Sequence, residues 1–345
     1  MRTAKLLAIY PLLKLYKYFE LPYITPISYV FLLTKRCNLR CRTCGIWKEK
    51  PRRELGLGEW LKIIKGLKKW PFWITFTGGE PFLVDYFDRI VVASTSINNP
   101  AIICIATNGS LPDVIKSKLS AILKRSKSTK IIVNLSLDNI GKKHDQLRRK
   151  PGSFKQVQKT IAIIKKLKTK HRNLLLGINT VISKFNFNEI YYLYDYITKV
   201  IKPDDYILEP AQKRFELNTR SYDIAPERKK LKEFLRMVIR KTKHSLVKKR
   251  GISFVKNLIR VGYYKNLLEP SKKKCNAGLL SCQIMPNSEV VACGVRHIVF
   301  GHLNEFDYDF RKLWLNRNAI DKRNKLRKSK CSCQLANIYY TNRFI

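Results

Sequence analysis

The sequence predicts an α/β protein built on a partial TIM-like (β/α)6 barrel, with a small cysteine-rich domain after it. Three observations lead to this prediction. Short apolar segments alternate with longer amphipathic ones from residue 28 to about 210. This alternation stops at residues 211–274, and five of the nine cysteines lie beyond it. A chain of 345 residues, 45% of them hydrophobic, is long and apolar enough to bury a large core.

Residues 1–27 are predicted to form a basic, apolar N-terminal arm. Its apolar stretch, Leu6–Leu13, is interrupted by Pro11 and is far shorter than the ~20 residues of a membrane span. No small-residue cleavage site follows, so no signal peptide is expected and the predicted location is cytoplasmic. Two alternatives stay open for the arm. It is either a helix packed on the barrel or an amphipathic helix peripheral to an anionic membrane surface.

Residues 28–210 are predicted to form the barrel. Segments rich in β-branched and aromatic residues predict strands at Ser28–Leu33, Trp73–Thr77, Ala101–Thr107, Lys130–Leu137, Leu174–Val181 and Tyr206–Glu209. Apolar residues three and four positions apart predict helices at Gly58–Lys69, Asp113–Lys124, Phe154–Lys168 and Phe187–Val200. This order predicts a parallel sheet with helical crossovers, so active residues should lie at the C-terminal ends of the strands.

Two further regions complete the predicted organisation. Residues 211–274 carry 20 basic and 5 acidic residues and predict a helical link, with helices at Ala225–His244 and Val255–Leu268. Residues 275–345 predict a small domain, with strands at Cys282–Met285 and Glu289–Cys293 around a turn.

A cysteine triplet follows the first predicted strand: Cys37, Cys41 and Cys44, with the spacing C-x3-C-x2-C. Soft sulfur ligands select iron–sulfur clusters, zinc or Cu(I). Structural zinc usually takes four ligands in a closed shell. Three cysteines on one short loop therefore favour a [4Fe–4S] cluster whose fourth iron is left open.

Polar residues and glycines end the other strands. The second strand runs into Gly78-Gly79-Glu80-Pro81, where glycine lets backbone approach a ligand, Glu80 can accept from an ammonium group, and Pro81 stiffens the exit. The third, fourth and fifth strands end in residues that could equally form turns or helix caps: Thr107, Asn108, Ser136, Asp138 and Asn179.

The triplet and the Gly-Gly-Glu-Pro segment together resemble the signature of the radical S-adenosylmethionine (radical SAM) superfamily. The resemblance implies that the open iron holds SAM and that the bound amino acid moiety meets Gly78, Gly79, Glu80 and Pro81. It further implies that Thr107 and Asn108 line the SAM pocket, that Ser136 and Asp138 lie near the ribose and sulfonium, and that Asn179 contacts the ribose. Thr43 departs from the aromatic residue usual before the third cysteine. The segment from His144 through Arg148 to Phe154 is similar to one common in this branch.

The C-terminal cysteines resemble the SPASM and twitch extensions of the same enzymes. The resemblance implies one auxiliary [4Fe–4S] cluster, on Cys275, Cys293, Cys331 and Cys333. Cys282, inside a strand pattern, is the spare that could replace one of them, and a structural zinc on the same four ligands is the alternative. Cys104, in an apolar strand, is predicted to be an inert core residue.

The resemblance implies an enzyme that reductively cleaves SAM to a 5′-deoxyadenosyl radical for hydrogen abstraction. It names no catalytic side chain beyond the cluster ligands, and it implies an electron donor such as ferredoxin or flavodoxin. The expected substrate is a peptide, a protein or a small metabolite. The net charge of +44 supports an alternative in which the enzyme acts on RNA or lipid. The competing explanation is that the charge reflects only a lysine-biased composition. An iron–sulfur electron carrier or binding protein is the non-enzymatic alternative.

Overall fold

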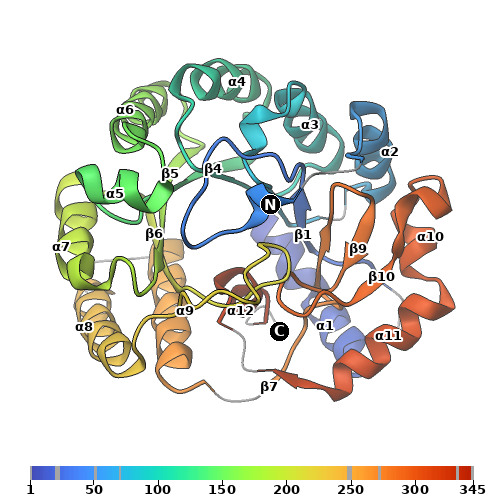
Figure 1. Cartoon of the computed structure of the whole chain (residues 1–345). Coiled ribbons are helices and arrows are strands. Elements are labelled where there is room, and N and C mark those ends of the chain that lie inside the picture. The colour runs from blue at the N-terminus through green and yellow to red at the C-terminus, as the bar shows by residue number, and fades with distance from the viewer. Residues whose placement is uncertain are drawn as a thin grey trace.

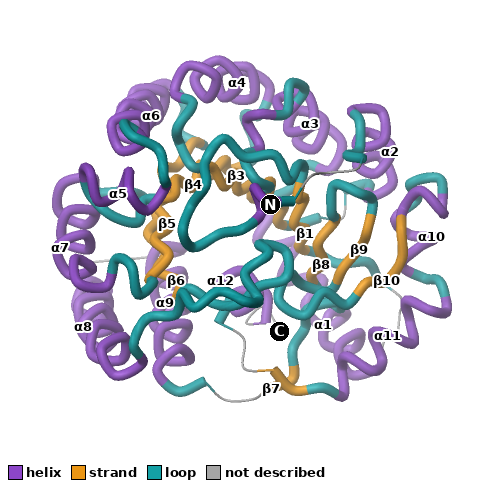
Figure 2. The backbone as a smooth tube through the Cα atoms, viewed as in Figure 1, coloured by secondary structure: helices purple, strands orange, loops and turns teal. Residues whose placement is uncertain are grey.

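The computed structural model describes residues 2–19, 24–49, 53–69, 71–246, 251–270, 273–331 and 334–342. Viewed along the barrel axis, the strands form an inner wall and helices ring its outside (Figure 1). The same view coloured by secondary structure shows loops gathered over one end of the strands (Figure 2).

One sheet carries the fold, with the strand order β10-β9-β8-β1-β2-β3-β4-β5-β6, in which the C-terminal strands are β8 (Ser281–Ile284), β9 (Glu289–Val291) and β10 (Val299–His302). Its first six strands in the chain pair in parallel, and the sheet stays open between β10 and β6. The prediction of a partial parallel barrel is confirmed, with each strand boundary within one residue of the expected one. These strands are β1 (Ser28–Leu32), β2 (Trp73–Thr77), β3 (Ile102–Thr107), β4 (Lys130–Ser136), β5 (Leu174–Ile182) and β6 (Asp205–Pro210).

Helices cover the outer face of the sheet (Figure 1). All four predicted barrel helices are present, although the fourth is α-helical only to Asp195 and continues as a π-helix over Tyr196–Ile201. Two helices, α3 and α5, were not predicted: α3 is seven residues long, and α5 has one apolar residue beyond its glycine. The barrel helices are α2 (Leu57–Leu67), α3 (Phe87–Ala93), α4 (Pro112–Arg125), α5 (Gly141–Arg148), α6 (Ser153–Lys170) and α7 (Ile190–Asp195).

The core lies between the strands and this helical ring. On β1 the side chains of Tyr29 and Phe31 point outward and are fully buried. The Phe31 ring stacks on Trp60 of α2 at 5.3 Å between centroids and meets Phe76 of β2 edge-on at 5.4 Å. Burying one such ring contributes roughly 1.5–3 kcal/mol. The alternate residues of β1 face the barrel interior, as the two-residue period of a strand requires.

The C-terminal region continues the barrel's own sheet. Strand β8 pairs in parallel with β1, Ser281 opposite Ser28, and β9 and β10 follow antiparallel. The domain boundary at residue 275 stays a prediction. The remaining elements of this region are β7 (Lys273–Lys274), β8 (Ser281–Ile284), β9 (Glu289–Val291), β10 (Val299–His302), α10 (Phe310–Trp314), α11 (Arg317–Lys328), β11 (Lys330–Cys331) and α12 (Ala336–Asn342).

Three helices lie on the open side of the sheet. The two predicted link helices are present as α8 (Arg228–Leu246) and α9 (Gly251–Leu268), which pack on each other. Helix α12 packs on α9, and the Tyr263 hydroxyl of α9 donates to the Gln334 carbonyl just before α12. Figure 2 shows α12 between β6 and the C-terminal strands, where the barrel would otherwise be open.

The N-terminal helix α1 (Arg2–Phe19) packs against the end of the barrel where the strands begin. Its Leu13 and Tyr16 are buried in a cluster with Ile27, just before β1, and Leu280, just before β8. The arm is therefore a helix packed on the barrel, as the first alternative predicts, and this packing occupies only one side of the helix. Among the described residues, no helix combines the length and apolarity that crossing a membrane requires.

Candidate active site in the barrel

The cysteine triplet lies at the C-terminal end of β1. Cys37, Cys41 and Cys44 line one cavity of about 120 Å3. The structure therefore brings the three thiols together with the ends of β2, β3 and β4, as the strand-end argument predicts. Other predicted residues on the wall of this cavity are Gly78, Gly79, Thr107, Asn108 and Ser136.

The two glycines hold the cysteine loop against the end of β2. The Gly79 amide donates to the Thr34 carbonyl at 2.7 Å, and the Glu80 amide donates to the Arg36 carbonyl at 2.9 Å. A Cβ on Gly78 would lie 2.5 Å from the Thr34 carbonyl oxygen, and one on Gly79 would collide with the Arg36 carbonyl. Only glycine fits at these two positions, because the loop backbone passes directly over them.

Glu80 is fully buried and does not line the cavity. Its carboxylate accepts from the Thr107 hydroxyl at 2.8 Å, the Asn108 amide at 2.8 Å and the Phe82 amide at 3.2 Å. In this structure the carboxylate thus ties the end of β2 to the end of β3 and holds Asn108 at the cavity wall. Pro81 is buried behind it at the start of a 3-10 helix.

The burial of Glu80 predicts that the stability of the protein depends on pH. Burial raises the pKa of this carboxyl to about 7, although hydrogen bonds from Asn108 and Thr107 oppose the shift. The folded protein therefore keeps the proton where the unfolded chain has lost it, and this group's contribution to stability falls as pH rises from about 4.5 to 7. Glu80→Gln cannot titrate. We therefore expect the free energy of unfolding of the variant, relative to that of the wild type, to rise between pH 5 and 8 by at most about 3 kcal/mol. Denaturant unfolding at several pH values measures this difference.

Glu59→Gln is the control for this experiment. The hydrogen bonds that Tyr308 and Gly56 donate to Glu59 outweigh its partial burial and lower its pKa. The contribution of Glu59 to stability is therefore lost as pH falls through the acidic range, whereas that of Glu80 is lost as pH rises. A stability difference between wild type and Glu80→Gln that does not change with pH would show that Glu80 is not protonated as described.

Arg148 places a buried positive charge beside the cysteines. From the end of α5, its guanidinium donates to the Cys41 sulfur at 3.4 Å and pairs with Asp138 at 2.7 Å. Asp138 lies beneath this guanidinium and also accepts from the Val181 amide at 2.9 Å, so it does not line the cysteine cavity. Sequence reasoning attached no role to Arg148. The only available signal was an arginine inside the His144–Phe154 segment.

The same segment is held by its own side chains. Asp145 accepts from the Gly152 and Phe154 amides and from the Ser153 hydroxyl, which fixes the start of α6. Burial lowers the pKa of His144 to about 3, so this histidine is neutral and packs against Phe154.

Two of the three thiols, Cys37 and Cys44, are protonated at neutral pH. Burial raises the pKa of Cys37 to about 11 and that of Cys44 to about 12. Metal binding therefore has to displace protons, which couples assembly of a metal centre to pH. In the described part of the chain, no three His, Cys, Asp or Glu side chains are grouped tightly enough to hold a single ion. The three thiols line one common cavity, and thiolates are the ligands of iron–sulfur clusters, so the residues present fit such a cluster.

A second cavity, of about 300 Å3, fills the barrel interior. It shares Thr77, Gly78 and Ser136 with the cysteine cavity, so the two spaces adjoin. Asn179 lines this larger cavity and not the smaller one. Cys104 also faces it, but burial raises the pKa of this thiol to about 12, which keeps it unreactive.

Three of the C-terminal cysteines converge at the far side of this interior cavity. Cys275 and Cys293 lie at one small apolar cluster that includes Leu335. The pKa of Cys331 is raised by burial and by the neighbouring Cys293. Cys333 lies outside the described residues. Cys282 is buried in β8 within the main core, and it also lines the interior cavity.

One loop that sequence reasoning treated as part of a helical link touches both cysteine regions. The Leu217 carbonyl accepts from the amide of Gly45, next to Cys44, at 2.8 Å. The Glu216 amide donates to the carbonyl of Gly294, next to Cys293, at 3.2 Å. Glu216 is buried and ion-paired with Arg214, and both line the interior cavity. The loop therefore walls the space between the two groups of cysteines.

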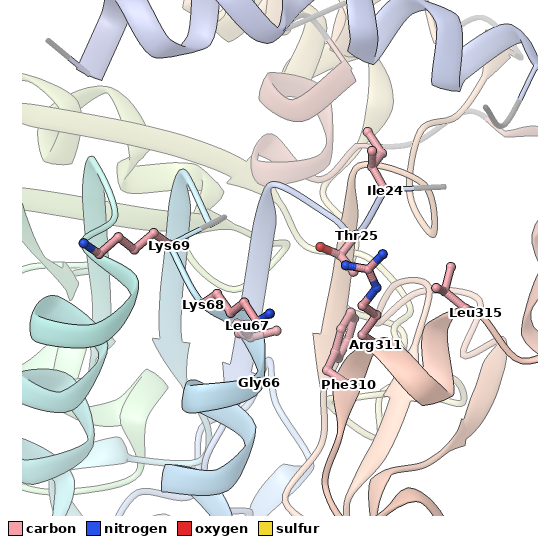
Figure 3. A pocket seen from close by; sticks show the side chains of 9 residues that line it. All are labelled: Ile24, Thr25, Gly66, Leu67, Lys68, Lys69, Phe310, Arg311 and Leu315. Carbon is pink, nitrogen blue, oxygen red and sulfur yellow. The ribbon is translucent and has the colours of Figure 1, made fainter. Parts of the chain in front are cut away.

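A third hollow, of about 320 Å3, lies near the beginning of β1 (Figure 3). Its wall holds Ile24, Thr25 and the cations Lys68, Lys69 and Arg311, with no cysteine or acidic residue among the described lining. It is at the opposite end of the barrel from the cysteine triplet.

Comparison with known proteins places the barrel in a family. Residues 31–197 match the sequence profile of the Radical SAM superfamily. A GTP 3′,8-cyclase of Clostridium botulinum (strain Hall) is 33% identical over 174 residues, 46% of this chain and 48% of that protein. The sporulation killing factor maturation protein SkfB of Bacillus subtilis (strain 168) is 29% identical over 167 residues, 48% of this chain and 38% of that protein. The chain thus spans about half or less of the length of these curated relatives.

Solved structures share the fold over more of the chain. The structure of anSMEcpe with bound AdoMet and Kp18Cys peptide superposes with a TM-score of 0.63 at 16% identity, covering 93% of this chain and 96% of that one. Streptococcus suis SuiB bound to S-adenosylmethionine gives a TM-score of 0.61 at 19% identity, covering 85% and 66%. At these identities the likeness is one of fold.

Proposed function

Residues 31–197 form a radical SAM domain, and from that premise we propose that the protein is an enzyme that cleaves S-adenosylmethionine reductively. The single observation that carries this proposal is the cavity that three cysteines line together with Gly78 and Gly79. When bound there, a [4Fe–4S] cluster supplies one electron to SAM, which divides into methionine and a 5′-deoxyadenosyl radical that removes a hydrogen atom from the substrate. The protein binds, orients and excludes water.

The residues at the cavity have separate proposed roles. Cys37, Cys41 and Cys44 hold the cluster and leave one iron open. The backbone at Gly78 and Gly79 comes close enough, without Cβ atoms, to meet the amino acid moiety of SAM. Glu80 keeps Asn108 at the wall from behind.

Other residues act on the far side of the bound nucleoside. Thr107 and Asn108 line the SAM pocket, and Ser136 and Asn179 reach its ribose. Ser136 lies on the wall shared by the two cavities, and Asn179 follows in the larger one, so SAM placed across both points into the barrel interior. Asp138 acts indirectly, because it holds the Arg148 guanidinium beside Cys41.

A second cluster is proposed on Cys275, Cys293, Cys331 and Cys333. The convergence of the first three at one side of the interior cavity supports it. Cys282 stays the spare, because it is buried in the core of the sheet. A structural zinc on the same ligands is the alternative that metal analysis would distinguish.

A peptide or protein is the proposed substrate class. The fold match to anSMEcpe, solved with a peptide bound, extends over the C-terminal region, whereas the match to GTP 3′,8-cyclase covers less than half of this chain. SuiB is also solved with a precursor peptide, SuiA, and SkfB is named as a maturation protein. A ferredoxin or flavodoxin is the proposed electron donor.

Deuterium transfer tests this function. Anaerobically reconstituted and reduced protein is incubated with SAM and a deuterated peptide mixture, or with deuterated GTP. We expect 5′-deoxyadenosine in both samples and deuterium in it only with peptide. Intact SAM, with the cluster confirmed by its absorption, would contradict the activity. Deuterium transferred from GTP alone would contradict the substrate class.

A further inference from the structure

Helix α1 exposes an apolar face that the described part of the chain leaves uncovered. Its inner side is buried through Leu13 and Tyr16. The outer side carries two rows of residues at four-residue spacing, which place their side chains on neighbouring lines along the helix. These rows are Tyr10, Lys14 and Tyr18, and Pro11, Leu15 and Phe19.

The exposure of this face is large. Leu15 is 50% exposed, Tyr18 66% and Phe19 69%. The Lys14 ammonium lies 5.0 Å from the centre of the Tyr10 ring, so the one cation of the two rows sits over an aromatic side chain. Helix α1 contains four basic and no acidic residues. An apolar face with tyrosines and a lysine at its margin is typical of helices that lie in a membrane interface.

Cations from other parts of the chain border this face. Helix α11 lies beside the end of α1, where the Arg327 guanidinium donates to the Tyr18 carbonyl. Lys325 and Lys328 of α11 are exposed. The hollow with Lys68, Lys69 and Arg311 is at the same end of the barrel, and Figure 3 shows α1 crossing the top of that view.

We propose that this end of the barrel docks on an anionic membrane surface, with the outer face of α1 in the interface and the surrounding cations on lipid headgroups. Apolar burial and charge complementarity then act together, as stable peripheral binding requires. The membrane is favoured over RNA, because binding along an RNA backbone needs a groove of cations, whereas the two rows hold five uncharged residues and one lysine.

This orientation leaves the candidate active site accessible. Helix α1 packs where β1, β2 and β8 begin, through Ile27, Phe72 and Leu280. The cysteine triplet follows the opposite end of β1, one strand length away, which is roughly 17 Å for five residues. A protein docked through α1 therefore turns its active site toward the aqueous phase, and its substrate arrives from there.

Vesicle flotation with the full chain tests the proposal independently of any catalytic activity. The probes are vesicles of phosphatidylcholine alone and of phosphatidylcholine with phosphatidylserine. We expect the wild type to bind the anionic vesicles. Leu15→Ser combined with Phe19→Ser should lower that binding at least tenfold. Val255→Ser combined with Leu258→Ser is the matched control on α9, where these side chains are 52% and 51% exposed, and it should bind like the wild type.

A second pair of variants tests the charges. Lys325→Glu combined with Lys328→Glu should weaken binding to anionic vesicles by about fivefold or more for each cation, and added salt should weaken the wild type likewise. Thermal unfolding checks that all variants are folded. Equal binding to both kinds of vesicle, or equal losses in the α1 and α9 variants, would overturn the proposal. So would RNA binding that depends on α11 but not on Leu15 and Phe19, with no vesicle binding.

Discussion

Replacing Cys37, Cys41 and Cys44 together by Ala is expected to abolish 5′-deoxyadenosine formation and to remove about half of the iron. The reconstituted wild type should carry about eight iron atoms in two [4Fe–4S] clusters. The three thiols line one cavity together with the ends of β2 and β3, and no other described cysteine lies on its wall. Iron analysis and chromatography of the SAM cleavage products measure the two effects.

Cys104→Ala is the matched control for the triple variant. This thiol is also buried within the barrel, but no described contact joins it to either group of cysteines. Its loss should leave both the iron content and the cleavage of SAM unchanged. SAM cleavage that survives in the triple variant would show that the site has been assigned to the wrong cysteines.

Replacing Cys275 and Cys293 by Ala is expected to separate the two halves of the proposed reaction. About half of the iron should be lost, because both residues are proposed ligands of the second cluster. The barrel site is built from other elements, so 5′-deoxyadenosine should still form without a substrate. Turnover of the true substrate should fail, because the cavity between the two groups of cysteines ends at Cys293.

Cys282→Ala is the control for this pair, and it should keep all of the iron. Burial raises the pKa of the Cys282 thiol well above its usual range, and it lies in β8 among core residues. Full iron content in the Cys275/Cys293 variant, together with one equivalent of zinc in the wild type, would show that the second cluster does not exist. A loss of iron in Cys282→Ala would show that Cys282 is a cluster ligand in place of one of the four proposed cysteines.

The barrel could be predicted from the sequence because its signals are local. Each strand is a short apolar segment, and each long helix shows its own period. The C-terminal strands could not be placed in this way. The pairing of Ser281 with Ser28 joins residues far apart in the chain, and nothing in either segment specifies the partner. Helix α5 was missed because its sequence is polar and its packing, through Leu147 and Arg148, follows from the barrel around it.

The candidate site was predictable in part for the same reason. The cysteine spacing and the Gly-Gly-Glu-Pro segment are continuous motifs. The positions of Glu80 and Arg148 depend on contacts between strands, such as the hydrogen bond from Asn108 to Glu80 and the ion pair of Arg148 with Asp138. Sequence reasoning placed Glu80 against the SAM ammonium, whereas in the structure it is buried behind the cavity wall. Its direct contact with SAM stays a prediction.

The central claim is that Cys37, Cys41 and Cys44 hold a cluster whose open iron binds SAM. Electron paramagnetic resonance of the reduced protein, recorded with and without SAM, tests it most directly. We expect SAM to change the signal of the wild type and of the Cys275/Cys293 variant, and the Cys37/Cys41/Cys44 variant to show no SAM-dependent signal. A reduced wild-type spectrum that SAM leaves unchanged would contradict the claim.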